Sequence, residues 1–532
     1  MPSPLRLTGT IASRGFAEGP LQPLAATTPL IRTSGSPTLE AQALRDAKTR
    51  AIAELKELAA ATQGPGADML EFQVAMLDDD ALTESTFERI ASGTSAGAAW
   101  TDTLGEQIEI YEAAEDEYFR ARSADIIDIR DRVLRVLSQA NDLAIPPGAI
   151  LAGDDLTPSQ FLAVDWARGG GIALRRGSAA SHVAMLARAR GVPMLVGLEG
   201  LPLAEGETAL IDAEEGSVTI GPTDEARTHF RRRAAAGAGQ KRRAEAAALA
   251  PGRTLDGTDI AVAINVADPG DLSDVDVRTC DGVGLMRTEF LYGGGLPDEE
   301  TQLAAFRRVV RWAEGRPVVI RTVDAGGDKP VAGFTIEETN PFLGLRGVRL
   351  ALAKPEIFRV QIRALLRVAA EGRVSVMFPM ISVPAEYEAA KTLFLEEAQV
   401  LAARGVNFAM PRLGIMVEVP AVAIFPELLS GAAFFSIGSN DLTQYVLAAS
   451  RDNGAVASLN EVRHPAVLGL ISNVVRFGQR HNLPVSLCGD AGGDPASLPD
   501  LLATGLRSIS VAPAQLPLAK LAISQLNLGA GS

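Results

Sequence analysis

The second half of the chain repeats a short apolar run followed by a helical pattern, and this repeat constrains the fold most. Seven runs after Pro251 have the length and apolar content of buried parallel strands. They are IAVAINV (260–266), GVGLMR (282–287), PVVIRT (317–322), VSVMFPM (374–380), LGIMVEV (413–419), AFFSIG (433–438) and PVSLCG (484–489). We expect a poorly marked eighth near 341–350. About 280 residues of this pattern favour a (β/α)8 barrel, a fold that typically takes about 250 residues, over a doubly wound open sheet.

Polar side chains stand at or just after the carboxyl ends of these runs. They are Arg287, Arg321, Asp324, Glu418, Asn440, Asp441 and Cys488. In a barrel they converge on one mouth, which is where enzymes of this fold work. Glu418 and Asp441, expected on neighbouring strands six and seven, suit a hard octahedral cation, and magnesium is the natural candidate. The alternative is that Asp441 caps a helix.

The first half of the chain changes character twice. Residues 1–20 predict strand, turn and strand, and 143–223 predict short strands around one clear helix, so together they form an α/β domain. The segment 21–142 between them is a helical domain whose acidic run has two interpretations, a solvated face or a docking face. Residues 224–253 are basic and alanine-rich, which indicates an exposed linker helix before the barrel domain, 254–532.

His182 is the one histidine of four in a context suited to phosphate. Small residues precede it in GSAASH, and the helical run VAMLARAR follows it. Small residues allow a phosphate to approach closely, and a helix start offers free N–H groups and a positive dipole end. A neutral imidazole at this place can accept a phosphoryl group. The structural alternative is a buried histidine that caps the helix.

Composition excludes several classes of protein. The net charge of −15 disfavours nucleic acid and anionic membrane as partners, and no run reaches the ~20 apolar residues of a membrane helix. The start of the chain lacks the pattern of a secretory signal, so we expect a cytoplasmic protein. Two cysteines, Cys280 and Cys488, are too few for a disulfide framework, so any special cysteine is a reduced thiol.

The ordered motifs of the chain resemble Enzyme I of the bacterial phosphoenolpyruvate:sugar phosphotransferase system. Besides the His182 segment, these are DLTPS (155–159), GLMRTEFL (284–291), IRTVDAGGDK (320–329), NPFLGLRG (340–347), GIMVEVP (414–420), IGSNDLTQY (437–445) and CGDAGG (488–493). FQVAMLDDDAL (72–82) and YFRARSADIIDIRDRVLRVL (118–137) resemble the helical domain of that family. The resemblance spans essentially the whole chain.

The resemblance implies an enzyme that moves the phosphoryl group of phosphoenolpyruvate to His182 and then to the phosphocarrier protein HPr, releasing pyruvate. It implies a swivelling phosphohistidine domain (1–20 plus 143–223), HPr docking on the helical domain, and homodimerisation through the barrel. Arg287, Arg321, Asn440 and Arg451 would bind the substrate, Glu418 and Asp441 would bind Mg²⁺, and Cys488 would protonate the enolate. We expect sugar uptake to be the process served.

The chain departs from the family pattern near the histidine. Arg175, Arg176, Gly177 and Ser178 stand where an acidic residue and two glycines are usual, and Phe161 stands where threonine is frequent. These positions bear on the orientation and local charge of His182. Asp490 replaces the glutamate that usually follows the Cys-Gly pair.

Three other functions share some or all of this chemistry. A pyruvate phosphate dikinase or phosphoenolpyruvate synthase would need a nucleotide-grasp domain, for which the sequence has no matching segment. A metal-dependent lyase acting on pyruvate enolate would have no use for residues 143–222. A regulatory, nitrogen-type phosphorelay Enzyme I shares all the chemistry and differs only in its downstream partners.

Overall fold

The computed structural model describes the chain except for residues 1–3, 25–34, 61–64, 113–116, 139–144, 180, 204, 274, 294, 328–330, 337, 451–455 and 530–532. The side chains at 65–68, 80–82, 112, 117–124, 182, 189 and 457 also lie outside the described set. The chain divides into two compact units, Met1–Gly237 and Ala238–Ser532.

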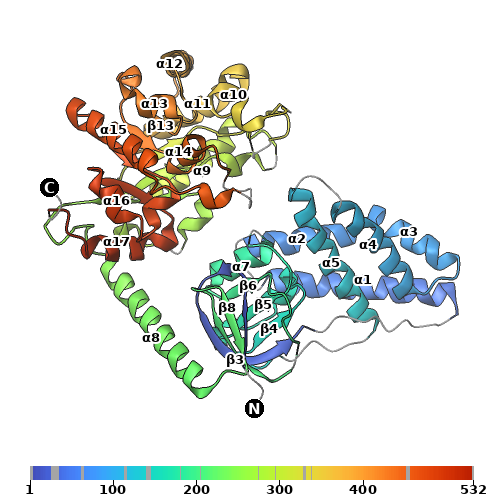
Figure 1. Ribbon diagram of the computed structural model, residues 1–532. Coiled ribbons are helices and arrows are strands. Elements are labelled where there is room, and N and C mark those ends of the chain that lie inside the picture. The colour runs from blue at the N-terminus through green and yellow to red at the C-terminus, as the bar shows by residue number, and fades with distance from the viewer. Residues whose placement is uncertain are drawn as a thin grey trace. The chain divides into compact units, whose positions relative to one another are not determined.

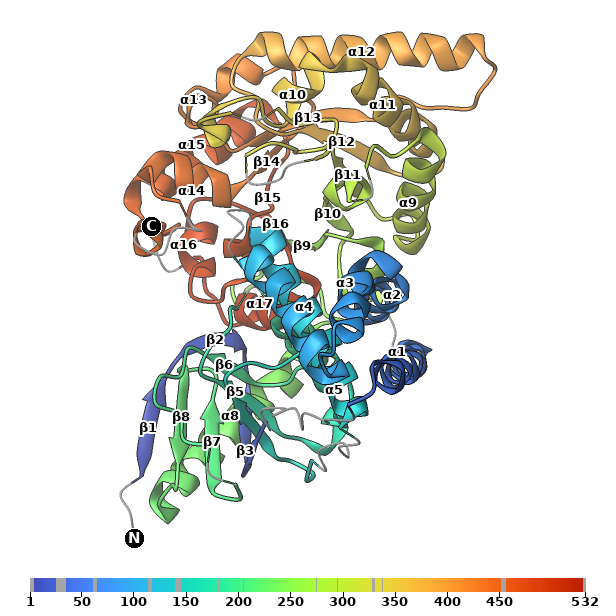
Figure 2. The same ribbon diagram turned by 90° about the vertical axis from the view of Figure 1, so that its right-hand side faces the viewer.

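The second unit contains a closed barrel of eight parallel strands (Figure 2). They are β9 (Ala261–Val266), β10 (Val283–Met286), β11 (Val318–Arg321), β12 (Val374–Phe378), β13 (Arg412–Val417), β14 (Phe435–Ile437), β15 (Val485–Leu487) and β16 (Ser508–Val511). Each strand pairs in parallel with the next, and β16 pairs with β9. The predicted barrel is therefore confirmed, and the open sheet is excluded because no strand is left at an edge.

The prediction of an eighth strand near 341–350 is wrong. That segment contains the 3-10 helix Pro341–Leu343 and the start of helix α10 (Val348–Ala353). Helix α10 has the sequence VRLALA, and its leucines and alanines are strong helix formers, which explains the helix. The eighth strand is β16, with sequence SISV, whose serines make it less apolar than the others. Glu418 and Asp441 consequently follow the fifth and sixth strands, which are still neighbours.

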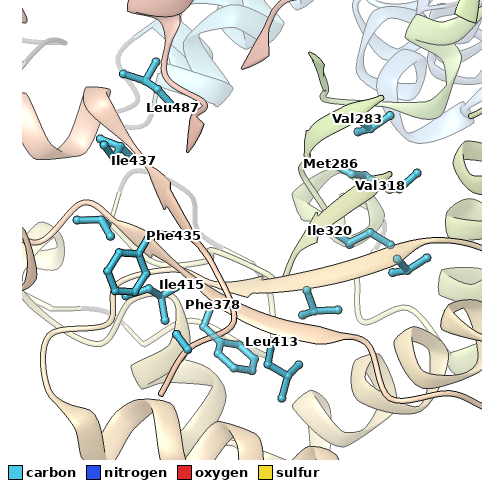
Figure 3. Close-up of a cluster of buried hydrophobic side chains, with 14 of the residues drawn as sticks. Val283, Met286, Val318, Ile320, Phe378, Leu413, Ile415, Phe435, Ile437 and Leu487 are labelled. Atoms are coloured by element: carbon cyan, nitrogen blue, oxygen red, sulfur yellow. The ribbon is translucent and has the colours of Figure 1, made fainter. Parts of the chain in front are cut away.

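Helices alternate with the strands and bury the outer face of the barrel. They include α9 (Glu299–Trp312), α10, α11 (Pro355–Ala369), α12 (Pro384–Ala403), α13 (Pro420–Ile424), α14 (Ser439–Leu447), α15 (Pro465–His481), α16 (Leu498–Ala503) and α17 (Leu516–Ser524). Figure 3 shows outward strand side chains of this core, such as Ile320, Ile415 and Phe435. The alternate side chains turn inward, and a second cluster there includes Met377, Met416 and Cys488.

The first unit holds an eight-stranded mixed sheet in the order β1-β8-β7-β3-β4-β5-β6-β2. The strands are β1 (Leu5–Thr8), β2 (Thr10–Ser13), β3 (Phe16–Pro23), β4 (Ile150–Gly153), β5 (Gly171–Leu174), β6 (Met194–Val196), β7 (Thr208–Asp212) and β8 (Ser217–Ile220). Only Gly9 separates β1 from β2, although they stand at opposite ends of this order, so the sheet curls strongly. The N-terminal segment forms three strands where two were expected.

Five helices form a bundle beside this sheet in the first unit (Figure 1). They are α1 (Pro37–Ala60), α2 (Pro65–Asp78), α3 (Asp80–Ala91), α4 (Ala96–Glu112) and α5 (Glu117–Leu137). Asp128 of α5 ties the bundle to the segment that follows β4, because it accepts hydrogen bonds from the Thr157 hydroxyl and the Ser159 N–H, each at 3.0 Å. Thr157 and Ser159 lie at the start of α6 (Pro158–Leu162). Helix α8 (Asp224–Ala247) spans the division between the two units.

Candidate active site

The predicted strand-end side chains share one end of the barrel. Residues at the carboxyl ends of its strands, or in the loops and first helical turns that follow them, are Arg287, Arg321, Asp324, Glu418, Asn440, Asp441 and Cys488. Because all eight strands run in the same direction, these ends form a single mouth. Arg451, the remaining predicted residue of the barrel, lies outside the described residues.

Glu418 is a fully buried carboxylate with only one oxygen satisfied. Its Oε1 accepts a 2.7 Å hydrogen bond from the Met380 N–H. Its Oε2 has no hydrogen-bond partner among the described atoms. Burial, together with the carboxylates of Asp441 and Asp324, raises the pKa of Glu418 to about 8, although two nearby arginines act in the opposite direction. The metal-free site therefore favours the neutral acid at physiological pH.

Arg346, which the strand-end pattern did not identify, joins two of these carboxylates. Its guanidinium is almost fully buried and donates to Asp324 from Nε at 3.1 Å and from Nη2 at 3.0 Å. The same Nη2 donates to Asp441 Oδ2 at 3.0 Å. Burial works against its charge, but Asp324 and Asp441 outweigh burial and raise the pKa of Arg346. Arg346 thus fixes the position of a predicted metal ligand.

One feature of the sequence indicates that Arg346 is a buried, paired charge, although the strand-end pattern does not identify this residue. Arg346 precedes helix α10 and follows no strand, so it lies outside the pattern of strand ends. It stands in the run LGLRG, a cation among leucines and glycines. A charged side chain in such a segment is buried only when it is paired.

Arg321 makes a second link to Asp324. Its Nη1 lies 3.1 Å from Asp324 Oδ2, and its Nη2 lies 3.0 Å from Glu289 Oε2. Glu289 in turn accepts a 2.8 Å hydrogen bond from the Asp324 N–H. Burial opposes the charge of Arg321, but Glu289 and Asp324 raise its pKa above the ordinary value. Both arginines are therefore permanent cations in a dry environment.

The most buried charges of the mouth do not balance. The carboxylates are Asp324, Glu418 and Asp441, and the cations are Arg321 and Arg346. If all five were ionised, one negative charge would remain in excess. A proton on Glu418 or a bound cation removes this excess, and either one lowers the cost of burial.

Two further predicted residues line the mouth. Arg287 is half-buried, and its Nε has no hydrogen-bond partner among the described atoms. Asn440 exchanges two hydrogen bonds with Asp490, donating from Nδ2 at 2.8 Å and accepting the Asp490 N–H at 3.0 Å. A Cβ on Gly489 would lie 1.8 Å from the Ser439 hydroxyl, so only glycine fits there. The shorter acid Asp490 therefore supports the Asn440 amide directly.

Cys488 is a buried thiol at the base of the mouth. Its Sγ donates to the Ile437 carbonyl at 3.6 Å, and its own carbonyl accepts a 3.1 Å hydrogen bond from Asn265. Burial raises the pKa of Cys488 to about 11, while a hydrogen bond from Ser436 acts in the opposite direction. The thiol is consequently protonated at neutral pH and able to donate a proton.

His182 begins helix α7 (His182–Arg190) in the first unit, as predicted. The Ser181 hydroxyl caps this helix by accepting the Ala184 N–H at 3.2 Å, and Gly191 ends it in the left-handed conformation at φ 64°. The backbone of His182 thus lies in the first turn, where the helix dipole favours an anion. The His182 side chain lies outside the described residues.

Two of the departures near His182, Arg175 and Phe161, have defined structural roles. Arg175 Nε donates a 2.8 Å hydrogen bond to the Leu201 carbonyl, and this bond restricts the movement of the arginine side chain. Phe161 is fully buried, and its ring stacks on Trp166 with centroids 5.1 Å apart. Phe161 therefore contributes to the core of the domain and has no hydroxyl to offer an imidazole.

The mouth fits a magnesium ion held largely by water and substrate. Among the described residues, no group of three or more His, Cys, Asp or Glu side chains is arranged to hold a metal. Mg²⁺ needs fewer protein ligands, since it usually binds one or two carboxylates together with waters and substrate oxygens. The unsatisfied Oε2 of Glu418 and the carboxylate of Asp441 are suitable donors.

Comparison with known proteins covers nearly the whole chain. Three family models match: PEP-utilising enzyme, N-terminal (residues 8–122), PEP-utilising enzyme, mobile domain (145–216), and PEP-utilising enzyme, PEP-binding domain (241–528). The phosphoenolpyruvate-protein phosphotransferase of Bacillus sp. (strain S) is 37% identical over 85% of this chain and 80% of its own length. That of Staphylococcus aureus (strain Mu50 / ATCC 700699) is 34% identical over 87% and 83%. In the described part of the chain, no helix is long and apolar enough to cross a membrane.

Proposed function

The chain belongs to the phosphoenolpyruvate-protein phosphotransferase family, and on that premise we propose that it transfers the phosphoryl group of phosphoenolpyruvate to His182 and then to a histidine of HPr. Its activity as a phosphoenolpyruvate-dependent phosphotransferase follows from the family. The residues that perform the reaction, the acceptor protein and the physiological process are our proposal. The observation that carries it is the buried network of Asp324, Arg346 and Asp441 beside Glu418.

In this proposal the barrel mouth binds phosphoenolpyruvate. Arg287, Arg321 and Arg451 hold its phosphate and carboxylate, because a guanidinium offers forked donors to both groups. Asn440 adds a neutral amide donor, which Asp490 orients. Arg346 keeps Asp441 in place for the metal.

Glu418 and Asp441 would hold Mg²⁺ in the mouth. A bound Mg²⁺ supplies charge stabilisation for the transferring phosphoryl group and for the pyruvate enolate. The pairing of Asp441 with Arg346 leaves Glu418 as the ligand with a free oxygen. Cys488 then gives its thiol proton to C3 of the enolate, for which its raised pKa suits it.

The three matched regions would divide the work between domains. His182 lies in the α/β domain (1–20 plus 143–223), which docks on the barrel and then swings away on the linker helix (224–253). The helical domain (21–142) would bind HPr, and the barrel domain (254–532) would form a cytoplasmic homodimer. Sugar uptake is the process that we propose; a regulatory, nitrogen-type phosphorelay would use the same residues with different downstream proteins.

Labelling with phosphoenolpyruvate tests the phosphoryl acceptor. The intact enzyme, incubated with Mg²⁺ and phosphoenolpyruvate labelled in the phosphate, should gain one acid-labile phosphoryl group per chain. His182→Ala should gain none. His229→Ala is the matched control, because His229 is an exposed histidine of α8, and it should be labelled like the intact enzyme. Full labelling of His182→Ala would refute the assignment.

A further inference from the structure

Three small polar side chains face the barrel interior from two adjacent strands. Ser436 is the middle residue of β14 and pairs in register with Ser486 of β15. Cys488 stands two residues after Ser486, so the two side chains lie on the same face of the strand. That face is the interior, because Cys488 belongs to the inner cluster whereas Leu487 packs outward in the core shown in Figure 3.

Hydrogen bonds connect Ser486 to Ser436 and Ser436 to Cys488. Ser486 Oγ donates to Ser436 Oγ at 3.3 Å. Ser436 also interacts with the Cys488 side chain through a hydrogen bond that lowers the pKa of the thiol, against the effect of burial. The thiol itself donates to the Ile437 carbonyl at 3.6 Å, which leaves its sulfur lone pairs free to accept. Ser486, Ser436 and Cys488 therefore form one connected line of polar side chains.

The three side chains also differ in their exposure to solvent. Cys488 and Ser436 are 2% and 1% exposed, whereas Ser486 is only partly buried. Ser486 precedes Cys488 on the strand, so it lies nearer the amino end of β15, on the side of the barrel opposite the mouth. The line therefore leads from the sulfur away from the substrate.

The proposed reaction creates a need for such a path. Each turnover consumes the thiol proton of Cys488, and the thiolate that remains is buried beneath bound product. Because the bound product covers the thiolate on the side of the mouth, a proton from the opposite side can reach the sulfur without passing the product.

We propose that Ser486 and Ser436 form a relay that returns a proton to Cys488 from the end of the barrel opposite the mouth. This inference rests on the proposed role of Cys488 as proton donor. Ser436 and Ser486 act through the thiol and never contact the substrate.

The protons balance over one cycle. The Cys488 S–H bond breaks and a C–H bond forms at C3 of the enolate, which leaves pyruvate and a thiolate. Ser436 gives its hydroxyl proton to the sulfur as it takes one from Ser486, and Ser486 takes one from water. The hydroxide formed is neutralised by buffer, so the net change is one solvent proton moved into the pyruvate methyl group.

Hydrogen exchange tests the relay separately from phosphoryl transfer. The intact enzyme with Mg²⁺ and pyruvate in heavy water should replace methyl hydrogens by deuterium, observed by NMR. In Ser436→Ala the proton taken from pyruvate returns before it exchanges, so deuterium incorporation should fall at least about tenfold. Single-turnover labelling from phosphoenolpyruvate should stay within about twofold of the intact rate, because that step needs only the proton already on the thiol.

Further variants separate a relay from a packing effect. Ser436→Thr keeps the hydroxyl and should restore exchange. Ser486→Ala leaves the hydrogen bond between Ser436 and the thiol intact and should also slow exchange. Ser375→Ala is the matched control, because Ser375 is a half-buried serine that faces the interior from β12, and it should exchange normally.

The outcomes distinguish this inference from the proposed function. Exchange by Ser436→Ala at the intact rate would overturn the relay. Loss of both exchange and labelling in Ser436→Ala and Ser436→Thr alike would show a structural role and would overturn it too. Exchange by Cys488→Ala at the intact rate would instead refute the proton donor, on which the relay depends.

Discussion

Binding of Mg²⁺ to the enzyme should release protons, because Glu418 must lose its proton before it can coordinate a cation. With a pKa of about 8 in the metal-free site, Glu418 is about 90% protonated at pH 7. Binding should therefore release about 0.9 protons per site at pH 7, about 0.5 at pH 8 and about 0.1 at pH 9. The apparent affinity for Mg²⁺ should rise about tenfold between pH 6 and pH 7.

Isothermal titration calorimetry measures this proton release directly. Mg²⁺ is titrated into the intact enzyme at one pH in several buffers, and the slope of the observed enthalpy against the buffer ionisation enthalpy gives the number of protons. Glu418→Gln keeps the shape of the side chain and should lose both the metal affinity and the proton release. Glu397→Gln is the matched control, since Glu397 is a buried glutamate held on the outside of the barrel by Arg359 and Arg363.

The reasoning fails if Mg²⁺ binds to the intact enzyme at pH 7 without release of protons. Glu418 would then be ionised in the metal-free protein, or it would not be a ligand. Glu418→Gln separates these two cases. Loss of Mg²⁺ affinity in this variant would identify Glu418 as a ligand, whether or not it is ionised in the metal-free protein. Normal proton release from Glu418→Gln would assign the proton to a different group.

Three further results are expected. Arg346→Lys keeps the charge but cannot bridge Asp324 and Asp441, so phosphoenolpyruvate-dependent labelling should slow by about 10²-fold or more, the effect of a misplacement of about 1 Å in an active site; a change below threefold would contradict the bridging role. A fragment of residues 1–237 should accept phosphate from phosphorylated HPr and none from phosphoenolpyruvate, and direct labelling by phosphoenolpyruvate would disprove the two-domain mechanism. The metal-free protein should lose thermal stability between about pH 4.5 and pH 8, because the unfolded chain ionises Glu418 first while the folded state still holds the proton. Glu418→Gln should flatten that slope, and an unchanged slope would show that other groups control it.

The apolar runs predicted most of the barrel because parallel strands buried on both faces are nearly continuous in apolar residues. The prediction failed where a strand carried polar residues inward. Ser508 and Ser510 alternate in β16, and the Ser510 hydroxyl donates to Asn265 inside the barrel at 2.6 Å. The inner face of a barrel tolerates such paired polar groups, so a strand that presents them has no continuous apolar run.

Some residues of the candidate site could be predicted from their position along the chain, and others only from the tertiary structure. Glu418 and Cys488 directly follow strands, so chain order was enough to place them at the mouth. Arg346 lies in the long connection between β11 and β12, and only the folded chain brings it to Asp324 and Asp441. Sequence patterns report residues on regular elements, whereas a residue carried by an irregular connection needs the tertiary structure.

The excess negative charge of the mouth explains two properties at once. Without a cation, the third carboxylate can be accommodated only as the neutral acid, which is why the pKa of Glu418 is raised. With Glu418 neutral, the five groups have no net charge and offer no net attraction to phosphoenolpyruvate, an anion with both a phosphate and a carboxylate. When a divalent cation displaces the proton from Glu418, the net charge of these five groups together with the cation rises from 0 to +1, so the proposed metal site also creates the attraction that the pocket needs to bind an anion. Ion pairing by Arg346 and Arg321 is therefore incomplete by one charge, and this incompleteness makes substrate binding depend on the metal.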